Sequence, residues 1–289
     1  MFELCAISDS VSDDLSQAAS VIAAAGLPCI ELQSVWKKPV GDLSAEELDT
    51  AKGIVDGAGL RVACLSHKNL FGAMPVLSTT VEDEAYQRHM DALHRVIAAA
   101  RLFGTNLVRI MCFRKESVLF GAHGAERAVV TAGAWDRFVE LMKPPVRVAQ
   151  EEGIQLVVEN STKGMVTSAW LARRLVDEVG SPALKVLWDP SNALYFDEPA
   201  FPDGYDELRG GYLGHLHVKD SIPDIRRARI DFAPLGEGRM APHLPKMAQA
   251  LEEDGYRGVV SLESLYRPPG GDAVAGFHAS LPALKALFV

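Results

Sequence analysis

Short apolar runs alternate with longer amphipathic segments along the chain. The runs are nearly continuous in apolar residues, which is typical of parallel strands that are covered on both faces. We predict strands over residues 2–8, 28–34, 61–67, 106–113, 154–160, 184–190, 213–220 and 258–264. The segments between them predict helices over residues 11–25, from 44 to 57 or 59, and over 83–103, 130–152, 168–179, 203–211, 241–253 and 272–287.

Local signals mark where several of these helices begin and end. Ser44 and Glu47 have the spacing of a capping box, which opens a helix. Gly104 stops the helix before it, as glycine commonly does at a helix C-terminus. Pro144-Pro145 interrupts the segment 130–152, where we expect a kink or a restart.

Eight strands alternating with eight helices predict a single-domain (β/α)8 TIM barrel over residues 1–289. A doubly wound sheet fits less well, because the turn after the first strand, SDSVSDD, has no glycine-rich fingerprint. The longest strand-to-helix connections are 67–82 and 221–240. Such loops lie on the catalytic face of a barrel, so we expect both to cover the site.

Four polar residues stand at or near the ends of the last four predicted strands. They are Glu159 in IQLVVEN, Asp189 in LKVLWDP, His217 in LGHLHVKD and Glu263 in GVVSLES. The period of two along a strand lets each point inward near the carboxyl end of the barrel. Three carboxylates and one imidazole suit Mn²⁺ or Mg²⁺ and tolerate Co²⁺ or Zn²⁺. The sequence therefore predicts one divalent metal site.

A metal site of this kind has a definite chemistry. The ion would polarise a substrate carbonyl and stabilise an enediolate. Glu159 and Glu263 would flank the substrate, one removing a proton and the other returning it. Epimerisation and aldose–ketose isomerisation share this intermediate, so the sequence leaves both open. Taken singly, each residue also has a structural reading: Asp189 could cap the turn in DPSN, and the histidines could be hydrogen-bonded in the core.

Composition narrows the possible partners. With 29 basic and 38 acidic residues the net charge is −9, which disfavours binding to nucleic acid. No apolar run approaches the ~20 residues of a membrane span, and the N-terminus lacks the pattern of a secretory signal. The four cysteines form no CxxC pair and read as buried residues in a reducing compartment, with Cys112 also near enough to a strand end to line a pocket. We expect a cytoplasmic protein with no membrane association.

Four motifs resemble those of a known family. They are VVEN at 157–160, WDPSN at 188–192, HLHVKD at 215–220 and SLES at 261–264. The chain resembles the xylose isomerase-like barrel superfamily, in the branch of sugar phosphate isomerases and epimerases that includes ketose 3-epimerases, hydroxypyruvate isomerase and inosose dehydratase. The resemblance implies Glu159, Asp189, His217 and Glu263 as metal ligands, with Glu159 and Glu263 as the acid/base pair. It favours His217 over His215 as the ligand.

The resemblance also suggests residues that contact the substrate. His67 ends the third strand, where relatives often have a histidine that faces substrate or metal. Asn192 stands where several ketose epimerases have a substrate-binding histidine. Arg109 could reach substrate or pair with a barrel carboxylate, and Glu31 could support polar groups from below or form an outward ion pair. The candidate substrate contacts are His67, Arg109, Asn192, His215 and Lys219.

Several functions remain open at this stage. The first hypothesis is an isomerase or epimerase of a small, carbohydrate-like compound, and the second is a dehydratase of the inosose dehydratase type. A zinc-cluster nuclease would need further histidines, and Asn192 occupies one of the matching positions. A fourth hypothesis is a non-catalytic ligand-binding barrel; the intact glutamate pair argues against it, and an activity measurement decides. Gly236-Glu237-Gly238 and Gly270-Gly271 could cradle a phosphate or form plain turns, and analogy suggests a homodimer or homotetramer.

Overall fold

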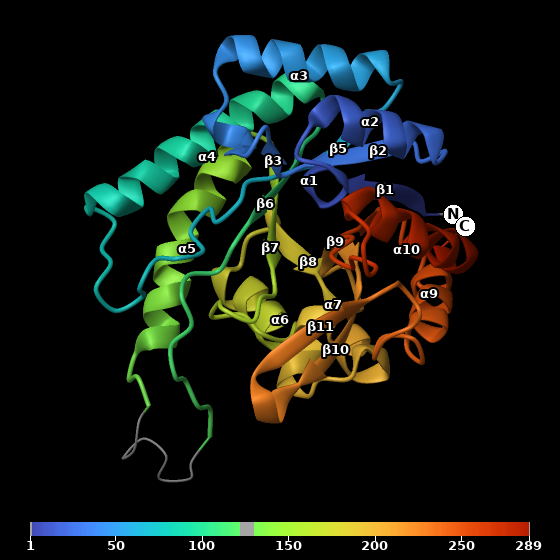
Figure 1. The fold of residues 1–289 in the computed structure, drawn as a ribbon. Helices are drawn as coiled ribbons and strands as arrows, with labels where there is room; N and C mark the ends of the chain where they lie inside the picture. Colours follow the sequence, from blue (N-terminus) through green and yellow to red (C-terminus); the bar gives the residue numbers. More distant parts are fainter. Residues whose placement is uncertain (1, 122–129, 289) are drawn as a thin grey trace.

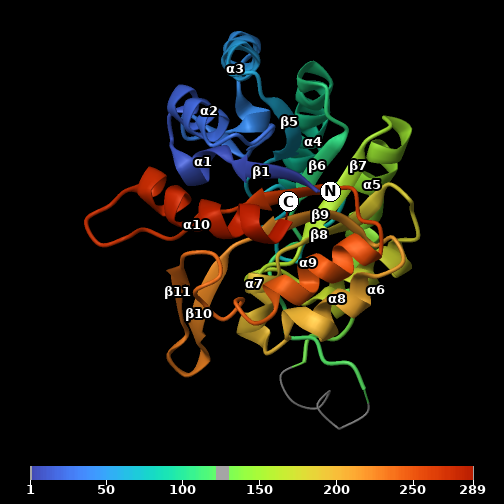
Figure 2. The same ribbon diagram turned by 90° about the vertical axis from the view of Figure 1, so that its right-hand side faces the viewer.

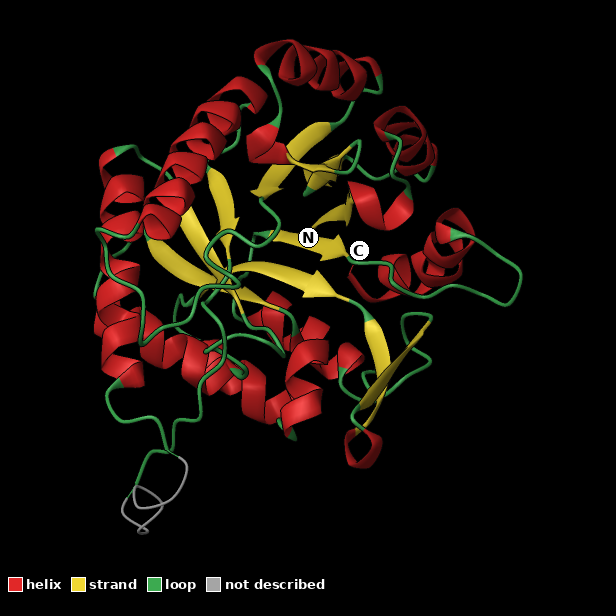
Figure 3. Cartoon of the chain, turned by 60° about the vertical axis from the view of Figure 1, so that its left-hand side comes forward, coloured by secondary structure: helices red, strands yellow, loops and turns green. Residues whose placement is uncertain are grey.

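Eight parallel strands close into a barrel. The structure, a computed structural model, describes residues 2–121 and 130–288. Figure 3 shows the strands enclosed by helices. Around the barrel the strands follow chain order and close where the last pairs with the first: β1 (Glu3–Ile7), β2 (Cys29–Leu32), β5 (Arg61–Ser66), β6 (Leu107–Ile110), β7 (Gln155–Glu159), β8 (Leu184–Trp188), β9 (Leu213–Val218) and β12 (Val259–Leu262). The predicted (β/α)8 TIM barrel is therefore confirmed.

Helices form the outer layer, as Figure 1 shows for α2 to α6, α9 and α10. Their bounds are α2 Leu15–Ala24, α3 Ala45–Gly57, α4 Glu84–Phe103, α5 Ala134–Glu151, α6 Ala169–Val179, α9 Leu244–Glu253 and α10 Ala273–Phe288, with shorter helices α1 Ser8–Val11, α7 Pro190–Ala193 and α8 Tyr205–Leu208. The predicted capping box is present: Ser44 Oγ accepts from the Glu47 amide and Glu47 accepts from the Ser44 amide. Gly104 ends α4 in the left-handed conformation, with φ at 73°. Within the described residues no helix has the length and apolarity needed to cross a membrane.

Three predicted helices differ from those in the structure. The first predicted helix begins later, at Leu15, because the Asp14 side chain caps it by accepting from the Gln17 amide. Helix α5 continues through both prolines, so the predicted restart is wrong. The helix predicted over 203–211 is reduced to α8 at Tyr205–Leu208.

The long connection after β9 is not a plain loop. It contains an antiparallel hairpin, β10 (Asp220–Asp224) and β11 (Arg229–Ala233), joined by the 3-10 turn η5 (Ile225–Arg227). Figure 2 shows this hairpin projecting from the barrel below α10. A second, shorter hairpin, β3 (Ser34–Val35) and β4 (Lys38–Pro39), follows β2 and leads into the 3-10 turn η1 (Val40–Asp42).

The barrel interior is polar at the carboxyl ends of the strands. The main apolar core lies between the strands and the helices, and includes Ile30, Val158 and Leu216. By contrast, Glu31, next to Ile30 on β2, is fully buried and faces the barrel axis together with His215 and Ser261. Burying such groups is unfavourable unless they are hydrogen-bonded. The interior is therefore where a function is to be sought.

Candidate functional site

The four predicted metal-ligand residues meet in one place. Glu159 is the last residue of β7, Asp189 follows β8, His217 lies in β9 and Glu263 follows β12. Each offers a ligand atom, and these atoms all lie within 4.8 Å of one another. The side chain of Glu263 is the most exposed of the four, at 15%, and opens the cluster toward the barrel mouth. We call these four residues the carboxylate–histidine cluster.

The topology explains this meeting. The four strands are consecutive in the barrel, in the order β7, β8, β9, β12. They run parallel, so their carboxyl ends lie at the same rim. His217 pairs in register with Ser261 on β12, two residues before Glu263, and Glu159 pairs with Leu187, two residues before Asp189. Alternation along the strands then turns all four side chains inward.

Glu159 is held by an ion pair with Arg109. Arg109 Nη1 lies 2.7 Å from Glu159 Oε2, and both side chains are buried. Burial opposes ionisation of Glu159, but the charge of Arg109, followed by His217, prevails and lowers its pKa to about 2. Of the two roles considered for Arg109, the structure shows pairing with a barrel carboxylate.

Lys219 bridges two members of the cluster. Its Nζ lies 2.5 Å from Asp189 Oδ2 and 2.5 Å from Glu263 Oε2. Burial acts to lower the pKa of Lys219, but Asp189 and Glu263 outweigh it and raise the pKa above its usual value. The ammonium therefore neutralises part of the negative charge gathered at the rim, and it stands beside one of the two proposed proton-transfer groups.

Asp189 serves two purposes at once. Its Oδ1 accepts from the amides of Ser191 and Asn192, which caps helix α7, while Oδ2 faces Lys219. Burial, opposed by Lys219 and reinforced by Glu263 and Glu159, raises its pKa to about 6. Asp189 thus caps the turn and also lies in the carboxylate–histidine cluster, while its role as a metal ligand stays a prediction.

A buried carboxylate supports His217 from below. His217 Nε2 lies 3.0 Å from Glu31 Oε1, and its Nδ1, without a hydrogen-bond partner, lies 3.6 Å from Glu159 Oε1. Burial alone would lower the pKa of His217, but Glu31 and Glu159 raise it to about 10. The ring therefore uses Nε2 for support and presents Nδ1 to the cluster.

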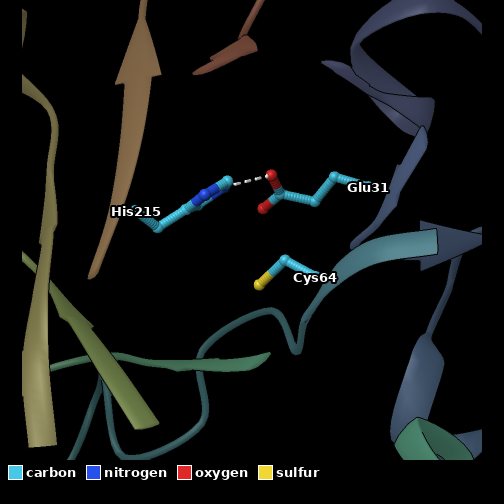
Figure 4. A group of neighbouring side chains, drawn as sticks. All are labelled: Glu31, Cys64 and His215. Carbon is cyan, nitrogen blue, oxygen red and sulfur yellow. Dashed lines mark hydrogen bonds and ion pairs between the residues drawn. The ribbon is translucent and has the colours of Figure 1, made fainter. Parts of the chain in front are cut away.

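Glu31 is the centre of a hydrogen-bonded network. Its carboxylate accepts from Ser66 and from Ser261, and it lies 2.8 Å from Nε2 of His215, as Figure 4 shows for that histidine. His215, two residues before His217, therefore lies deeper in the barrel and is fully buried. Its position is that of a supporting group for Glu31 rather than of a substrate contact. Of the two readings of Glu31, the inward one is correct.

Glu31, Cys64 and His215 also lie close enough together to hold an ion (Figure 4). We assign them to the network instead, for two reasons. The oxygens of Glu31 already accept from histidine and serine groups. Burial, followed by the charge of Glu31, raises the pKa of Cys64, and a protonated thiol is a poor metal ligand.

Two further predicted residues, Asn192 and His67, have their described side-chain contacts outside the four cluster side chains. Asn192 donates through Nδ2 to the carbonyl of Asn160, at 2.9 Å. His67 makes a hydrogen bond through Nδ1 to the Lys68 carbonyl, and its Nε2 lies 3.9 Å from Asp42. Burial lowers the pKa of His67. The described contacts of His67 are thus with the η1 side of the barrel and not with the cluster.

Asn160 is a residue that sequence reasoning missed. Its Oδ1 accepts from the Asp189 amide at 2.8 Å and its Nδ2 donates to the Asp189 carbonyl at 2.9 Å. This paired amide contact fixes the end of β8 against the end of β7. The signal was its place directly after Glu159 in VVEN, but nothing local identifies its partner.

The carboxylate–histidine cluster fits a divalent cation. Nδ1 of His217 is buried and has no hydrogen-bond partner among the described residues. An unsatisfied polar atom is unfavourable in a protein interior unless a ligand binds to it. Three carboxylate side chains and one imidazole are a mostly hard donor set. Glu31 behind His217 provides the carboxylate–histidine support that metal-binding histidines commonly have.

Comparison with known proteins agrees with this fold. The family described as xylose isomerase-like TIM barrel matches residues 19–287. A 2-epi-5-epi-valiolone 7-phosphate 2-epimerase from Actinoplanes sp. (strain ATCC 31044 / CBS 674.73 / SE50/110) is 31% identical over 133 residues, which are 46% of this chain and 43% of that enzyme. The chain thus spans less than half the length of this relative.

Solved structures share the fold at low sequence identity. The probable 3-DHS dehydratase AsbF from Bacillus anthracis superposes with a TM-score of 0.75 at 16% identity, over 98% of this chain and 99% of that one. The IOLI protein with a bound zinc atom gives 0.74 at 15% identity, over 99% and 98%. A D-psicose 3-epimerase gives 0.71 at 18% identity, over 99% of each chain. A fusion protein of such a barrel with 4-hydroxyphenylpyruvate dioxygenase gives 0.72 at 18% identity, over 99% of this chain but only 42% of that one.

Proposed function

Because the chain belongs to the xylose isomerase-like TIM barrel family, we propose that it is a divalent-metal-dependent isomerase or epimerase of a small sugar or hydroxy-carbonyl compound. The observation that carries the proposal is the approach of four ligand atoms from Glu159, Asp189, His217 and Glu263 to within 4.8 Å. Similarity to a sugar-phosphate-type epimerase over 133 residues supports the reaction class.

The carboxylate–histidine cluster would hold the ion. Mn²⁺ or Mg²⁺ fits the donor set best, and Co²⁺ or Zn²⁺ is tolerated. The zinc atom bound to a structure of the same fold supports an ion in such a barrel. When bound, the ion would act as a Lewis acid on a substrate carbonyl.

Glu159 and Glu263 are the proposed proton-transfer pair. They come from β7 and β12, the outer members of the four consecutive strands, so they approach a substrate from two sides. One carboxylate removes the proton from a carbon beside the carbonyl, and the other returns a proton to the opposite face, which inverts the centre. Return to the neighbouring carbon gives an isomerase instead. The Arg109 ion pair keeps Glu159 ionised and so able to act as a base.

A dehydratase is the second candidate, favoured by the position of Lys219. Its ammonium lies 2.5 Å from Glu263, so a base and a proton donor stand side by side. Such a pair could remove a proton and protonate a departing hydroxyl, with loss of water. The similarity to a probable dehydratase shows a shared fold; the mass of the product separates the two reactions.

The test is deuterium exchange with a substrate panel. Ketoses, ketose phosphates, inososes and hydroxypyruvate are incubated with the protein and Mn²⁺ in D₂O, and the products are analysed by NMR and mass spectrometry. We expect deuterium next to a carbonyl, lost in Glu159→Gln and in Glu263→Gln. Glu237→Gln, on the exposed loop after β11, is the matched control. A wild-type rate in either of the first two variants would refute the assignment.

A further inference from the structure

The glycines after β11 are not available to bind an anion. Asp220 Oδ2 accepts from the amides of Gly236 and Gly238, at 3.0 and 2.9 Å, and Oδ1 accepts from the amide of Met240, at 2.9 Å. A carboxylate of the chain thus occupies the cradle that the sequence offered to a phosphate. The Gly271 amide likewise donates to the Pro268 carbonyl. If a substrate carries an anionic group, another part of the barrel mouth must receive it.

A cavity of about 350 Å³ lies at the carboxyl ends of β5, β6 and β7. This volume is within the range of small-molecule sites. We call it the β5–β7 cavity; its lining includes Asn69, Cys112, Arg114, Ser161, Lys163 and Gly164. It lies at the same rim of the barrel as the carboxylate–histidine cluster, and Cys112 Sγ in its lining donates to the main-chain carbonyl of Glu159, at 3.5 Å.

Backbone hydrogen bonds connect the three loops that line the cavity. The Met111 amide donates to the Leu70 carbonyl at 2.9 Å, and the Lys115 amide donates to the Lys163 carbonyl at 2.8 Å. Gly164 is required by this packing, since a Cβ there would overlap Cys112 Sγ. The side chains that line the cavity are therefore carried on backbone whose position is fixed.

Backbone strain gathers around the same cavity. Asn69 and Phe113, both in its lining, have backbone φ angles of 65° and 31°. Phe71, in the same loop as Asn69, has a φ of 63°. Asparagine tolerates the left-handed region, but phenylalanine rarely adopts it. Strained residues of this kind concentrate at ligand sites, where the surrounding structure holds them in place.

The cavity is positively charged in a chain whose net charge is −9. Arg114 and Lys163 both line it. Among residues 2–121 and 130–288, neither forms an ion pair with a carboxylate oxygen within 4.0 Å. Two cations without carboxylate partners match the charge of a phosphate dianion better than that of a single carboxylate. Asn69 and Ser161 add neutral hydrogen-bonding groups.

We propose that the β5–β7 cavity binds the phosphate group of a phosphorylated substrate, with Arg114 and Lys163 as its charged contacts. This inference rests on the proposed function for the remainder of the substrate, whose carbonyl end would lie at the carboxylate–histidine cluster. It makes Arg114, after β6, and Lys163, after β7, determinants of substrate class. It also explains why a phosphate need not bind near Gly236.

Inorganic phosphate is the probe for the first test. It is titrated into the full-length protein by ³¹P NMR or calorimetry at constant ionic strength, once with EDTA and once with Mn²⁺, so that phosphate bound to a metal is recognised. We expect the double variant Arg114→Gln/Lys163→Gln to raise the Kd about tenfold or more, because charge-assisted hydrogen bonds are lost. Arg226→Gln, an exposed arginine in η5, is the control and should leave the Kd unchanged. Circular dichroism and thermal melting establish that each variant folds.

A kinetic arm separates this inference from the proposed function. Exchange in D₂O is compared for a ketose and for the phosphate ester of the same ketose. The double variant should lower kcat/KM for the ester and leave the unphosphorylated sugar unaffected. If neither compound exchanges deuterium but phosphate binding depends on Arg114 and Lys163, the proposed function is refuted while the phosphate site in the cavity is supported. Phosphate binding that is absent, or equal in the double variant, would overturn the cavity assignment even if exchange occurs.

Discussion

Replacement of Glu31 by glutamine tests how the site is supported. In the wild-type protein Glu31 lies 3.0 Å from Nε2 of His217 and 2.8 Å from Nε2 of His215, so both rings can donate to it. A glutamine side chain has one acceptor oxygen and one amide that can only donate. One of the two rings must then accept at Nε2. If that ring is His217, it loses the Nε2 proton, and the proton that remains is on Nδ1, the atom that faces the carboxylate–histidine cluster.

The expected effect is on metal binding rather than on folding alone. Loss of a supporting contact of this kind typically weakens metal binding by about 10–100-fold, or about 1.4–2.7 kcal/mol. The hydroxyls of Ser66 and Ser261 can rotate to suit the new group, which limits the disturbance to the histidines. Glu31→Gln should therefore remain folded and bind Mn²⁺ more weakly.

Calorimetric titration with Mn²⁺ measures the affinity, and ¹⁵N NMR of the imidazoles in the EDTA-treated protein reports which nitrogen carries the proton. Glu3→Gln is the control, because Glu3 lies at the start of β1 and pairs with the half-exposed Arg61. Ser261→Ala, which keeps the carboxylate, should have a smaller effect than Glu31→Gln. Equal Mn²⁺ affinity in Glu31→Gln and wild type, with an unchanged His217 tautomer, would show that Glu31 does not position the histidine.

Three further outcomes are expected. Glu159→Gln and Glu263→Gln should each reduce turnover in the deuterium assay by a factor on the order of 100 or more while remaining folded by circular dichroism, and Glu159→Gln should also lower the melting temperature, because Arg109 loses its buried counter-charge. Lys219→Met should lower the melting temperature in EDTA, because Asp189 and Glu263 lose their counter-charge, and should show a larger rise on Mn²⁺ addition than wild type; an unchanged rise would contradict this. Ser44→Ala should cost about 1 kcal/mol in urea unfolding through loss of the α3 capping box, and no loss would show that the cap is energetically silent.

The strands of the barrel could be predicted because burial on both faces leaves a local trace. Each strand of a parallel barrel is covered by helices and by the opposite interior, so apolar residues fill it almost without interruption. The run IQLVVEN became β7 at Gln155–Glu159, and LKVLWDP became β8 at Leu184–Trp188. The polar residues that end such runs were therefore conspicuous, and parity along the strand indicated that they face inward.

The hairpin β10–β11 could not be predicted in the same way. It is buried only at its base, at Asp220, Ser221 and Ala233, while Ile222 is 49% and Phe232 37% exposed, so no continuous buried face imposes a pattern on the sequence. The segment RIDFAPLGEG consequently resembled a loop. The strand pairing is visible only in three dimensions, where Ser221 lies opposite Phe232.

Partners of the buried polar residues were also beyond the sequence. Glu31 and His217 are 186 positions apart, and only closure of the barrel brings β2 and β9 across from each other. Parity alone indicated that Glu31 either faced inward or lay in an outward ion pair. The same holds for Asn160, whose contact with Asp189 crosses between two strands. The local sequence thus shows which polar residues end the strands, while the hydrogen-bond partners that fix their positions depend on the closed barrel.

Different parts of the barrel should also determine the class of reaction and the choice of substrate. Three residues that support the carboxylate–histidine cluster are fully buried on strands: Glu31, His215 and Ser261. They cannot contact the outer part of a substrate, so residues of the loops at the rim must contact it. After β9 the rim is already tied by Asp220 to the amides of its own loop, whereas after β6 and β7 it presents Arg114 and Lys163 without carboxylate partners among the described residues. Substrate selection should therefore respond to changes in these two loops, while changes around Glu31 should alter metal affinity for every substrate alike.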